Sequence, residues 1–254
     1  MPACEFILTP AESKRLIARG VLKHEKVEKA LDAGIVTIPT GSTNAYIVEE
    51  LLDSDFNRST YLSGITIPSH KKRSDFIKDS PHPDVIFRNG KLDPDLDRRT
   101  ALQHMQPGDV FIKGANALNY SEQLAGILIG GFGGGGTIGS ALGHIQGRRL
   151  HLIIPVGLEK CVAGDIEHIT RHLNEPREFD PDAPRMISVR GIIITEIEAL
   201  KILTGVDVHH IASGGIGGAE GAVRLLAEGS SEQLTQAKEV INEISGETPF
   251  WPMN

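Results

Sequence analysis

The chain has few cysteines and few aromatic residues, and both shortages narrow what it can be. Two of its 254 residues are cysteines, Cys4 and Cys161. They lie far apart and form no CxxC pattern, so the sequence predicts neither a disulfide framework nor a cysteine metal site. Aromatic residues make up 5% of the chain, with a single tryptophan. A core must therefore be mostly aliphatic, as is typical of parallel sheets covered by helices.

Positive charge and long apolar runs are also scarce. The formal net charge is −7, which excludes a broad surface for nucleic acid. No apolar run approaches the ~20 residues that span a bilayer. No basic segment precedes the short apolar stretch near the N-terminus, so we expect no secretory signal. We expect a cytoplasmic protein that binds neither nucleic acid nor a membrane.

Apolar strands alternate with amphipathic helices along most of the chain. Residues 35–40, "IVTIPT", are a predicted strand, and the helix "NAYIVEELL" follows directly. Similar pairs recur, which predicts an α/β fold with a doubly wound, mostly parallel sheet. A proline-rich, acidic stretch at 176–186 divides residues 1–175 from residues 187–254. We expect the second part to form a small C-terminal α/β lobe or to complete the same domain.

Local signals predict several further elements. Thr9 and Glu12 form a capping-box pattern, so the chain is expected to open on a helix, followed by a strand and another helix. "YLSGITI" is a predicted strand, and "PDVIFRNGKL" is a strand with a turn at Asn89-Gly90. The C-terminal part is predicted to run strand, helix, strand, glycine-rich turn, and then two helices.

Three loops combine glycines and hydroxyls between a predicted strand and a predicted helix: 40–43, 133–140 and 213–221. A helix N-terminus has free N–H groups that bind anions, and glycine lets the backbone approach them closely. In a parallel sheet such loops lie at the carboxyl ends of the strands. The alternative is that the glycines only make tight turns. None of the loops has a Walker A or a convincing dinucleotide pattern, so we expect no cofactor.

The order of these motifs resembles ribose-5-phosphate isomerase type A, and more broadly its superfamily with glucosamine-phosphate deaminases and CoA-transferases. The resemblance covers residues 11–165 and comprises "TGST", "VFIKGANALN", "GFGGGGTIGSALGHI" and "LIIPVGLEK". It implies a phosphate site, for which the candidate ligand-binding residues are Thr40, Gly41, Ser42, Thr43, Asn116, Gly134, Gly135, Gly136, Thr137 and Lys160.

The chain departs from the isomerase pattern at its catalytic positions. Lys113 and Asn116 stand where the isomerases carry two aspartates, and Phe132 replaces a lysine before the glycine run. The catalytic glutamate of the family aligns near Ala141, which has no carboxylate beside it. An isomerase of this type needs a carboxylate base to move a proton between carbons. The resemblance therefore supports the scaffold and an anion pocket better than the isomerase reaction.

Two residues are candidates for a catalytic role in this altered site. Lys113 ends an apolar strand, where it could hold an anion, act as a desolvated nucleophile, or be an ordinary surface lysine. Glu220, beside the third glycine loop, could supply the missing base if the C-terminal segment folds over the pocket. Thr195 and Glu198 form a capping-box pattern, which favours a structural role for Glu198. The role of Glu196 stays open.

These observations together predict a protein that binds a small phosphorylated or otherwise anionic metabolite. It would be a sugar-phosphate-type isomerase or lyase of altered chemistry. The alternatives are a CoA-ester enzyme of the same superfamily and a non-catalytic metabolite sensor. We expect a homo-oligomer with no metal.

We predict that the protein does not convert ribose 5-phosphate to ribulose 5-phosphate at a useful rate. The reason is the absence of a carboxylate at Ala141 and the exchange of both aspartates, at Lys113 and Asn116. A coupled assay of ribulose 5-phosphate formation measures this, with a type A isomerase as the positive control. Efficient turnover would contradict the prediction.

Overall fold

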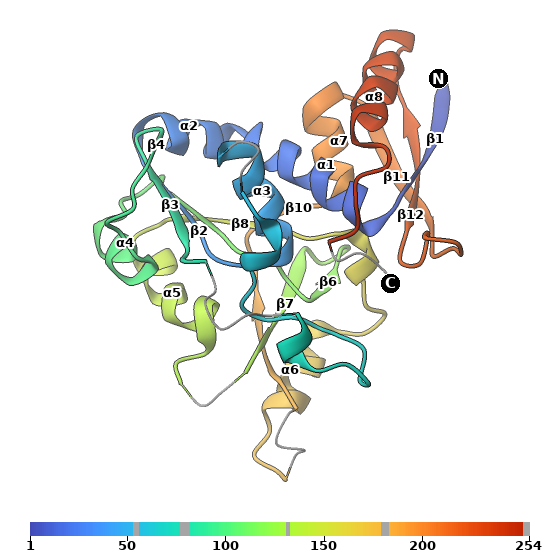
Figure 1. Ribbon diagram of the computed structural model, residues 1–254. Coiled ribbons are helices and arrows are strands. Elements are labelled where there is room, and N and C mark those ends of the chain that lie inside the picture. The colour runs from blue at the N-terminus through green and yellow to red at the C-terminus, as the bar shows by residue number, and fades with distance from the viewer. Residues whose placement is uncertain (53–55, 77–81, 131–132, 179–182, 251–254) are drawn as a thin grey trace.

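The computed structural model shows a mixed α/β protein (Figure 1). It describes residues 1–52, 56–76, 82–130, 133–178 and 183–250. The helices are α1 (Pro10–Leu22), α2 (Glu25–Ala33), α3 (Ser42–Leu52), α4 (Arg98–His104), α5 (Gly136–Gly147), α6 (Ile166–Asn174), α7 (Glu196–Thr204) and α8 (Ser231–Ile244). The strands are β1 (Ala3–Leu8), β2 (Ile35–Ile38), β3 (Val85–Arg88), β4 (Lys91–Leu92), β5 (Val110–Ile112), β6 (Ala117–Asn119), β7 (Leu124–Ile129), β8 (His151–Pro155), β9 (Arg185–Val189), β10 (Ile192–Ile194), β11 (Asp207–Ser213) and β12 (Val223–Glu228).

The main sheet has six strands in the order β10-β8-β5-β2-β3-β4. The four strands from β10 to β2 are parallel, and β3 and β4 add an antiparallel hairpin at one edge. Every residue of β2 and β5 is buried, which explains why these strands read as continuous apolar runs. The predicted turn at Asn89-Gly90 is confirmed, with φ of 49° and 76°, the left-handed values that a tight hairpin turn needs.

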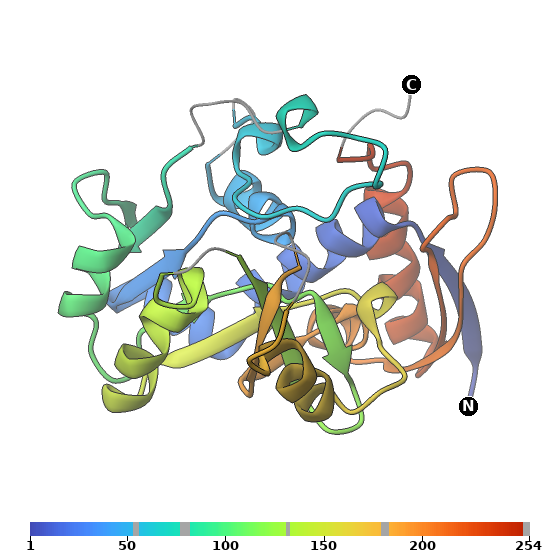
Figure 2. The same cartoon turned by 90° about the horizontal axis from the view of Figure 1, so that it is seen from below.

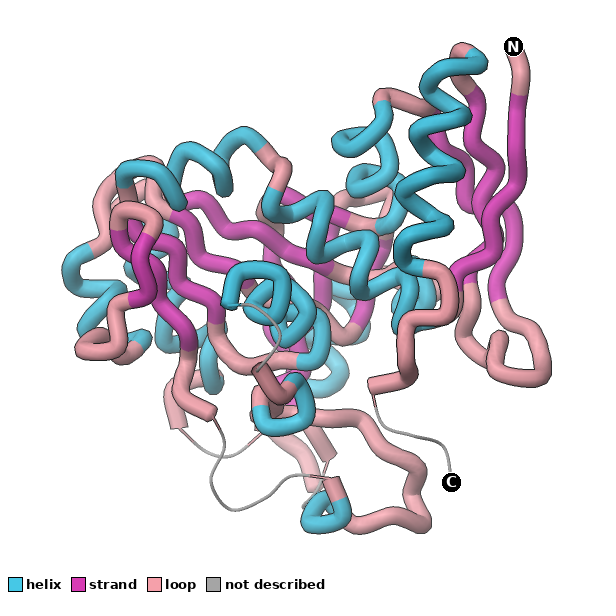
Figure 3. The backbone as a smooth tube through the Cα atoms, turned by 45° about the horizontal axis from the view of Figure 1, so that its top comes forward, coloured by secondary structure: helices cyan, strands magenta, loops and turns pink. Residues whose placement is uncertain are grey.

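A smaller antiparallel sheet combines the two ends of the chain in the order β1-β12-β11. Figure 3 shows it as a separate group of strands beneath the N-terminus. The prediction of a helix after the third glycine loop is wrong, because "VRLLAE" forms β12. Its alternating burial, with Val223, Leu225 and Ala227 inside, follows the two-residue period of a strand. The sequence also predicts that the chain opens on a helix. That helix is α1, but β1 precedes it and pairs with β12 along its full length.

A third sheet places β7 between β6 and β9, and all its pairings are antiparallel. The glycine run therefore follows a strand that lies outside the main sheet. Parallel pairing in the described residues is confined to the four strands of the main sheet and one isolated bridge. The α/β class is confirmed, but the sheet arrangement is mixed.

Helix α1 joins the main sheet to the C-terminal helices. It contacts β8 and β10 on one side and α3, α7 and α8 on others. Figure 2 shows α8 between α1 and the small sheet. The contact between α1 and α7 is closest at Gly20, where an added Cβ would lie 2.5 Å from the Cα of Ala199. A side chain at position 20 would hold the two helices apart.

The two predicted capping boxes are confirmed, because Thr9 with Glu12 and Thr195 with Glu198 make the reciprocal bonds. The strand expected in "YLSGITI" is wrong, since residues 61–67 form an irregular loop. The proposed division into 1–175 and 187–254 stays a prediction. Strand β10 from the second part lies in the main sheet, whereas β11 and β12 pair with β1. No helix in the described residues is long and apolar enough to cross a membrane.

We predict that Gly20→Ala destabilises the protein by about 1–3 kcal/mol, because the new methyl group overpacks the contact between α1 and α7. Denaturant unfolding at pH 7 measures the effect. Gly143→Ala is the matched control, since this exposed helical glycine has nothing within 4 Å of an added Cβ. The control should be neutral or stabilising by up to ~1 kcal/mol. Equal free energies of unfolding for the two variants would contradict the close contact.

Candidate functional site

Polar and charged side chains gather where the four parallel strands end. The chain leaves β2 toward α3, β5 toward Lys113, β8 toward Glu159 and Lys160, and β10 toward Glu196. Because the strands are parallel, these four exits lie at one edge of the sheet. We use the name carboxyl edge for the residues at these four strand ends and for the residues of other elements that contact them.

The first turn of α3 is attached directly to the end of β5. The side-chain amide of Asn44 donates to the carbonyl of Pro39 at 2.7 Å and to that of Ile112 at 3.0 Å. Its own Oδ1 is buried and has no protein partner. This side chain therefore fixes the start of α3 beside Lys113, the residue that follows β5.

Two N–H groups of the loop before α3 already donate hydrogen bonds to other protein groups. The N–H of Thr40 donates to the Asp84 carboxylate at 2.9 Å, and that of Gly41 donates to the Tyr61 carbonyl at 3.0 Å. Within the described ranges, the N–H groups of Ser42, Thr43 and Asn44 have no such partner. The predicted phosphate site at this loop is therefore smaller than the sequence indicates. It is limited to the first helical N–H groups, because the Thr40 and Thr43 side chains are buried.

Lys113 is a half-buried cation at the carboxyl edge, directly after β5. Its Nζ donates to the carbonyl of Gly114 at 3.2 Å, and it forms no ion pair with any described residue. Burial and the ammonium of Lys160 lower the pKa of Lys113 to about 8, while Asp84 acts in the opposite direction. An ammonium in this position is available to a negatively charged group.

Asp84 and Arg98 form an ion pair next to Lys113. The Asp84 carboxylate thus accepts one hydrogen bond from the N–H of Thr40 and another from the Arg98 guanidinium. The Nε of Arg98 is buried without a hydrogen-bond partner. The pair is electrically balanced, so it leaves the positive charge of Lys113 uncompensated.

The other end of the carboxyl edge holds two carboxylate groups, one fully buried and one half-buried. Glu196 is 0% exposed. Its Oε2 accepts from the N–H of Leu158 at 2.9 Å, but Oε1 has no partner. The Oε2 of Glu159 is also buried and unpartnered. Burial, and then the charge of Glu159, raise the pKa of Glu196 to about 7, against hydrogen bonds that include the Ser13 hydroxyl.

Lys14 lies close to these carboxylates and Lys160 lies close to Lys14, but neither lysine forms an ion pair with a described carboxylate. Lys14 Nζ donates to the carbonyl of Pro10 at 3.0 Å, and Lys160 Nζ to that of Ala115 at 3.0 Å. Burial lowers the pKa of Lys14, although the nearby Glu159 and Glu196 favour its charged form. Lys14, Glu159, Lys160 and Glu196 thus form a polar cluster whose charges interact at longer range.

The remaining predicted site residues lie elsewhere. Asn116 is exposed, and its Oδ1 accepts from the N–H of Leu128 in β7. Gly134, Gly135 and Gly136 have φ between 56° and 71° and lead into Thr137 of α5, after the separate sheet. Glu220 sits in the exposed turn between β11 and β12, where it accepts from the N–H of Gly218. Phe132 lies outside the described residues.

The third glycine loop does not have the predicted architecture. It connects two antiparallel strands, β11 and β12, instead of a strand and a helix. The expectation that all three loops meet at the carboxyl ends of parallel strands is therefore wrong. Of the three, only the loop at 40–43 follows a strand of the main sheet.

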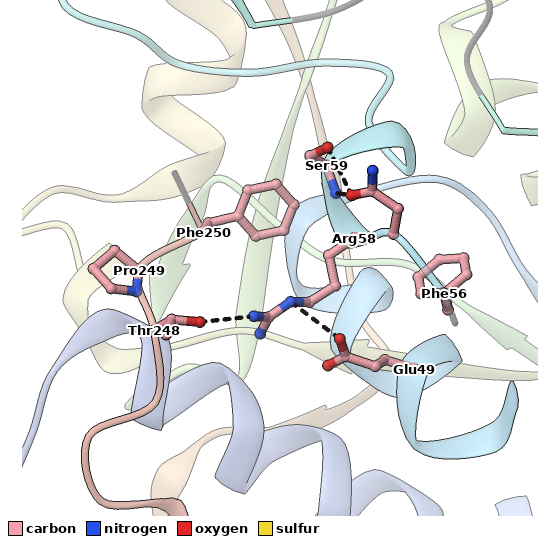
Figure 4. Close-up of a pocket in the computed structure, with 8 residues that line it drawn as sticks. Glu49, Phe56, Arg58, Ser59, Thr248, Pro249 and Phe250 are labelled. Atoms are coloured by element: carbon pink, nitrogen blue, oxygen red, sulfur yellow. Dashed lines mark hydrogen bonds and ion pairs between the residues drawn. The ribbon is translucent and has the colours of Figure 1, made fainter. Parts of the chain in front are cut away.

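A separate hollow of about 490 Å³ lies between the start of η1 (Arg58–Thr60) and the C-terminal segment (Figure 4). Arg58 stacks over the ring of Tyr46, 4.3 Å from its centre, and pairs with Glu49 and Glu247. Arg15 stacks on the same ring and pairs with Glu49, Glu50 and Glu247. Both guanidinium groups are thus already neutralised by carboxylates.

Comparisons with family models, with curated proteins and with solved structures found no match to this chain. The resemblance to the isomerase superfamily therefore stays a prediction. Within the described residues, no three or more His, Cys, Asp and Glu side chains are grouped to hold a metal ion.

Sequence reasoning identified Lys113 and Lys160 but missed most of their neighbours. Glu159 directly precedes Lys160, and Glu196 comes two residues after a strand of the main sheet. A carboxylate right after an apolar strand is the signal that could have singled out Glu196. Asp84 lies just before β3, Arg98 begins α4 and Lys14 belongs to α1, and no local pattern connects these residues with the site.

We predict that Glu196→Gln stabilises the protein more at pH 8 than at pH 5, by ~1–3 kcal/mol. The pKa of this carboxyl rises from 4.5 to about 7 on folding. Between these values the folded state holds a proton that the unfolded state has lost, so raising the pH through this window costs wild type stability. The amide variant has no such cost. Denaturant unfolding at both pH values measures the difference.

The control for this variant is Glu198→Gln, on the same turn of α7, where a glutamine can still complete the capping box. Its free energy of unfolding at the two pH values is the reference for Glu196→Gln. An effect of Glu196→Gln that is the same at pH 5 and pH 8 would show that the carboxyl does not titrate in this window.

Proposed function

We propose that this protein binds a small phosphorylated or otherwise anionic metabolite at the carboxyl edge, between the start of α3 and Lys113. It acts as an isomerase or lyase whose chemistry differs from ribose-phosphate isomerisation. The observation that carries the proposal is the Lys113 ammonium, which is half-buried and has no carboxylate in ion-pair contact within the described ranges.

Burial of an unpaired ammonium is costly, and an anionic ligand would offset that cost. The N–H groups of Ser42, Thr43 and Asn44 supply hydrogen-bond donors and the positive end of the helix dipole near the same place. Lys160 adds a second positive charge. An anion here would be met by both a helix N-terminus and ammonium groups, as phosphate sites commonly are.

The hollow beside Arg58 is the weaker candidate for the same ligand. Its arginines are balanced by Glu49, Glu50 and Glu247, so an anion would have to displace carboxylates that already form good ion pairs. Charge balance therefore favours the carboxyl edge.

A CoA-ester enzyme of the same superfamily is the second candidate. The buried Glu196 carboxyl favours it, because that class often uses a glutamate as its nucleophile. Incubation with acetyl-CoA and mass spectrometry of the intact protein would test it, since a covalent adduct would be lost in Glu196→Gln. Assembly as a homo-oligomer stays a prediction.

We predict that Lys113→Met weakens binding of inorganic phosphate by about tenfold or more. A charge-assisted bond in a partly desolvated pocket contributes roughly 1.5–3 kcal/mol, and methionine keeps the stem but removes the charge. Calorimetric titration at pH 7 measures the affinity. Stability at pH 7 should stay the same or rise slightly, because the variant no longer buries an ammonium. In wild type, phosphate binding should also weaken as the pH rises through about 8, the pKa of Lys113.

Lys201→Met is the matched control, because this exposed lysine pairs with Asp207 on the surface and does not contribute to the polar groups of the carboxyl edge. It should bind phosphate like wild type. Equal phosphate affinities for wild type and Lys113→Met, or no phosphate binding by wild type, would refute the proposed site.

A further inference from the structure

The strongest unassigned feature is the pair of carboxyl groups at Glu159 and Glu196. Each has one buried oxygen without a hydrogen-bond donor, although buried polar atoms are normally satisfied. Glu196 is fully buried, and the two groups are close enough to affect each other's charge. Helix capping explains Glu198 but not Glu196, because the capping box uses only the former.

The geometry of Glu159 depends on the glycine beside it. A Cβ added at Gly157 would lie 1.7 Å from Oε2 of Glu159. The carboxylate therefore folds back over a position that only glycine leaves open. This placement turns Glu159 toward the polar cluster and not toward solvent, where a glutamate in a short 3-10 helix would otherwise point.

Positive charge lies near both carboxylates but does not neutralise them by contact. Lys14 and Lys160 each donate to a backbone carbonyl, and neither forms an ion pair with a described carboxylate. A proton acceptor and an ammonium group thus lie together in a desolvated cluster. That combination suits a reaction in which a proton leaves and negative charge develops close by.

We propose that Glu196 is the general acid–base residue of the carboxyl edge, that Glu159 is its positioning residue, and that the ligand is an anionic compound with a carbonyl group. This inference rests on the proposed function, since Lys113 and α3 would hold the anionic end. Glu196 lies outside residues 11–165, so it belongs to none of the motifs that carry the family resemblance. It supplies the carboxylate that Ala141 lacks, in place of the exposed Glu220.

The reaction step needs no further reagent. The carboxylate of Glu196 takes a proton from the carbon next to the carbonyl group, so a C–H bond breaks and an O–H bond forms on Glu196. The electron pair moves to the carbonyl oxygen, giving an enolate that the Lys14 ammonium stabilises. Return of the proton to the same carbon restores the ligand, and its delivery to another position isomerises it.

The surroundings of Glu196 suit this exchange near neutral pH. It faces Ser13 and Lys14 on α1, Glu159 and Cys161 in and after η3 (Leu158–Lys160), and the N–H of Leu158. Burial and Glu159 favour its protonated form, whereas the hydrogen bonds favour its ionised form. A group balanced in this way can both accept and return a proton.

The test is solvent exchange in D₂O, followed by proton NMR. The probes are dihydroxyacetone phosphate, fructose 6-phosphate and pyruvate. Wild type should catalyse exchange of the hydrogen next to the carbonyl group for at least one probe. Glu196→Gln should slow this exchange a hundredfold or more, while its affinity for inorganic phosphate stays within twofold of wild type. Circular dichroism confirms that the variant is folded.

Three further variants complete the design. Glu198→Gln is the matched control and should exchange at the wild-type rate. Glu159→Gln and Gly157→Ala should each shift the midpoint of the pH profile of exchange, because they change the charge or the place of the carboxylate beside Glu196. If Glu196→Gln does not fold, Glu196→Asp replaces it and should slow exchange at least tenfold.

The outcomes separate this inference from the proposed function. Suppose that phosphate binding depends on Lys113, but Glu196→Gln exchanges at the wild-type rate or wild type exchanges none of the probes. This result overturns the role of Glu196 and leaves the anion site standing. Absence of phosphate binding by wild type overturns the anion site itself. A pH profile that is unchanged in both Glu159→Gln and Gly157→Ala overturns the positioning role of Glu159.

Discussion

Parallel pairing of β2, β5, β8 and β10 is the constraint on which the candidate site depends. These strands are buried and nearly continuous in apolar residues, so they pair in the interior with helices packed around them. Their common direction brings four loops from distant parts of the sequence to one edge. This pairing brings Lys113, Lys160 and Glu196 to the same edge of the sheet, although no short-range signal connects them.

Charge balance distinguishes this edge from the rest of the molecule. Around Tyr46, Arg15 and Arg58 are paired with glutamates and stacked on an aromatic ring, an arrangement that stabilises the contact between α1, α3 and the C-terminal segment. At the carboxyl edge, the Lys113 ammonium has no ion-pair partner among the described residues, and one oxygen each of Glu159 and Glu196 has no hydrogen-bond donor. Groups that are buried but incompletely paired cost stability, and perturbed pKa values of this kind cluster at functional sites.

Helix α1 connects these regions. Its Arg15 takes part in the ion pairs around Tyr46, its Ser13 and Lys14 face Glu196, and its Gly20 permits close contact with α7. Helix α7 begins at Glu196, so the packing of the two helices also determines where this carboxyl lies. A shift of α1 would therefore change both the stability of the fold and the geometry of the polar cluster.

The sequence by itself determined local structure: the capping boxes at Thr9 and Thr195, the hairpin at Asn89-Gly90, the α/β class and the place of Lys113 directly after a buried strand. Each depends on neighbours a few residues away. It could not determine that "VRLLAE" is a strand, because its helical and strand periods compete until β1 and β11 pair with it. Nor could it bring Asp84, Lys14 and Glu196 to one site or show that Glu220 is exposed. Only the tertiary structure decided these, because burial and unpaired charge arise from long-range packing.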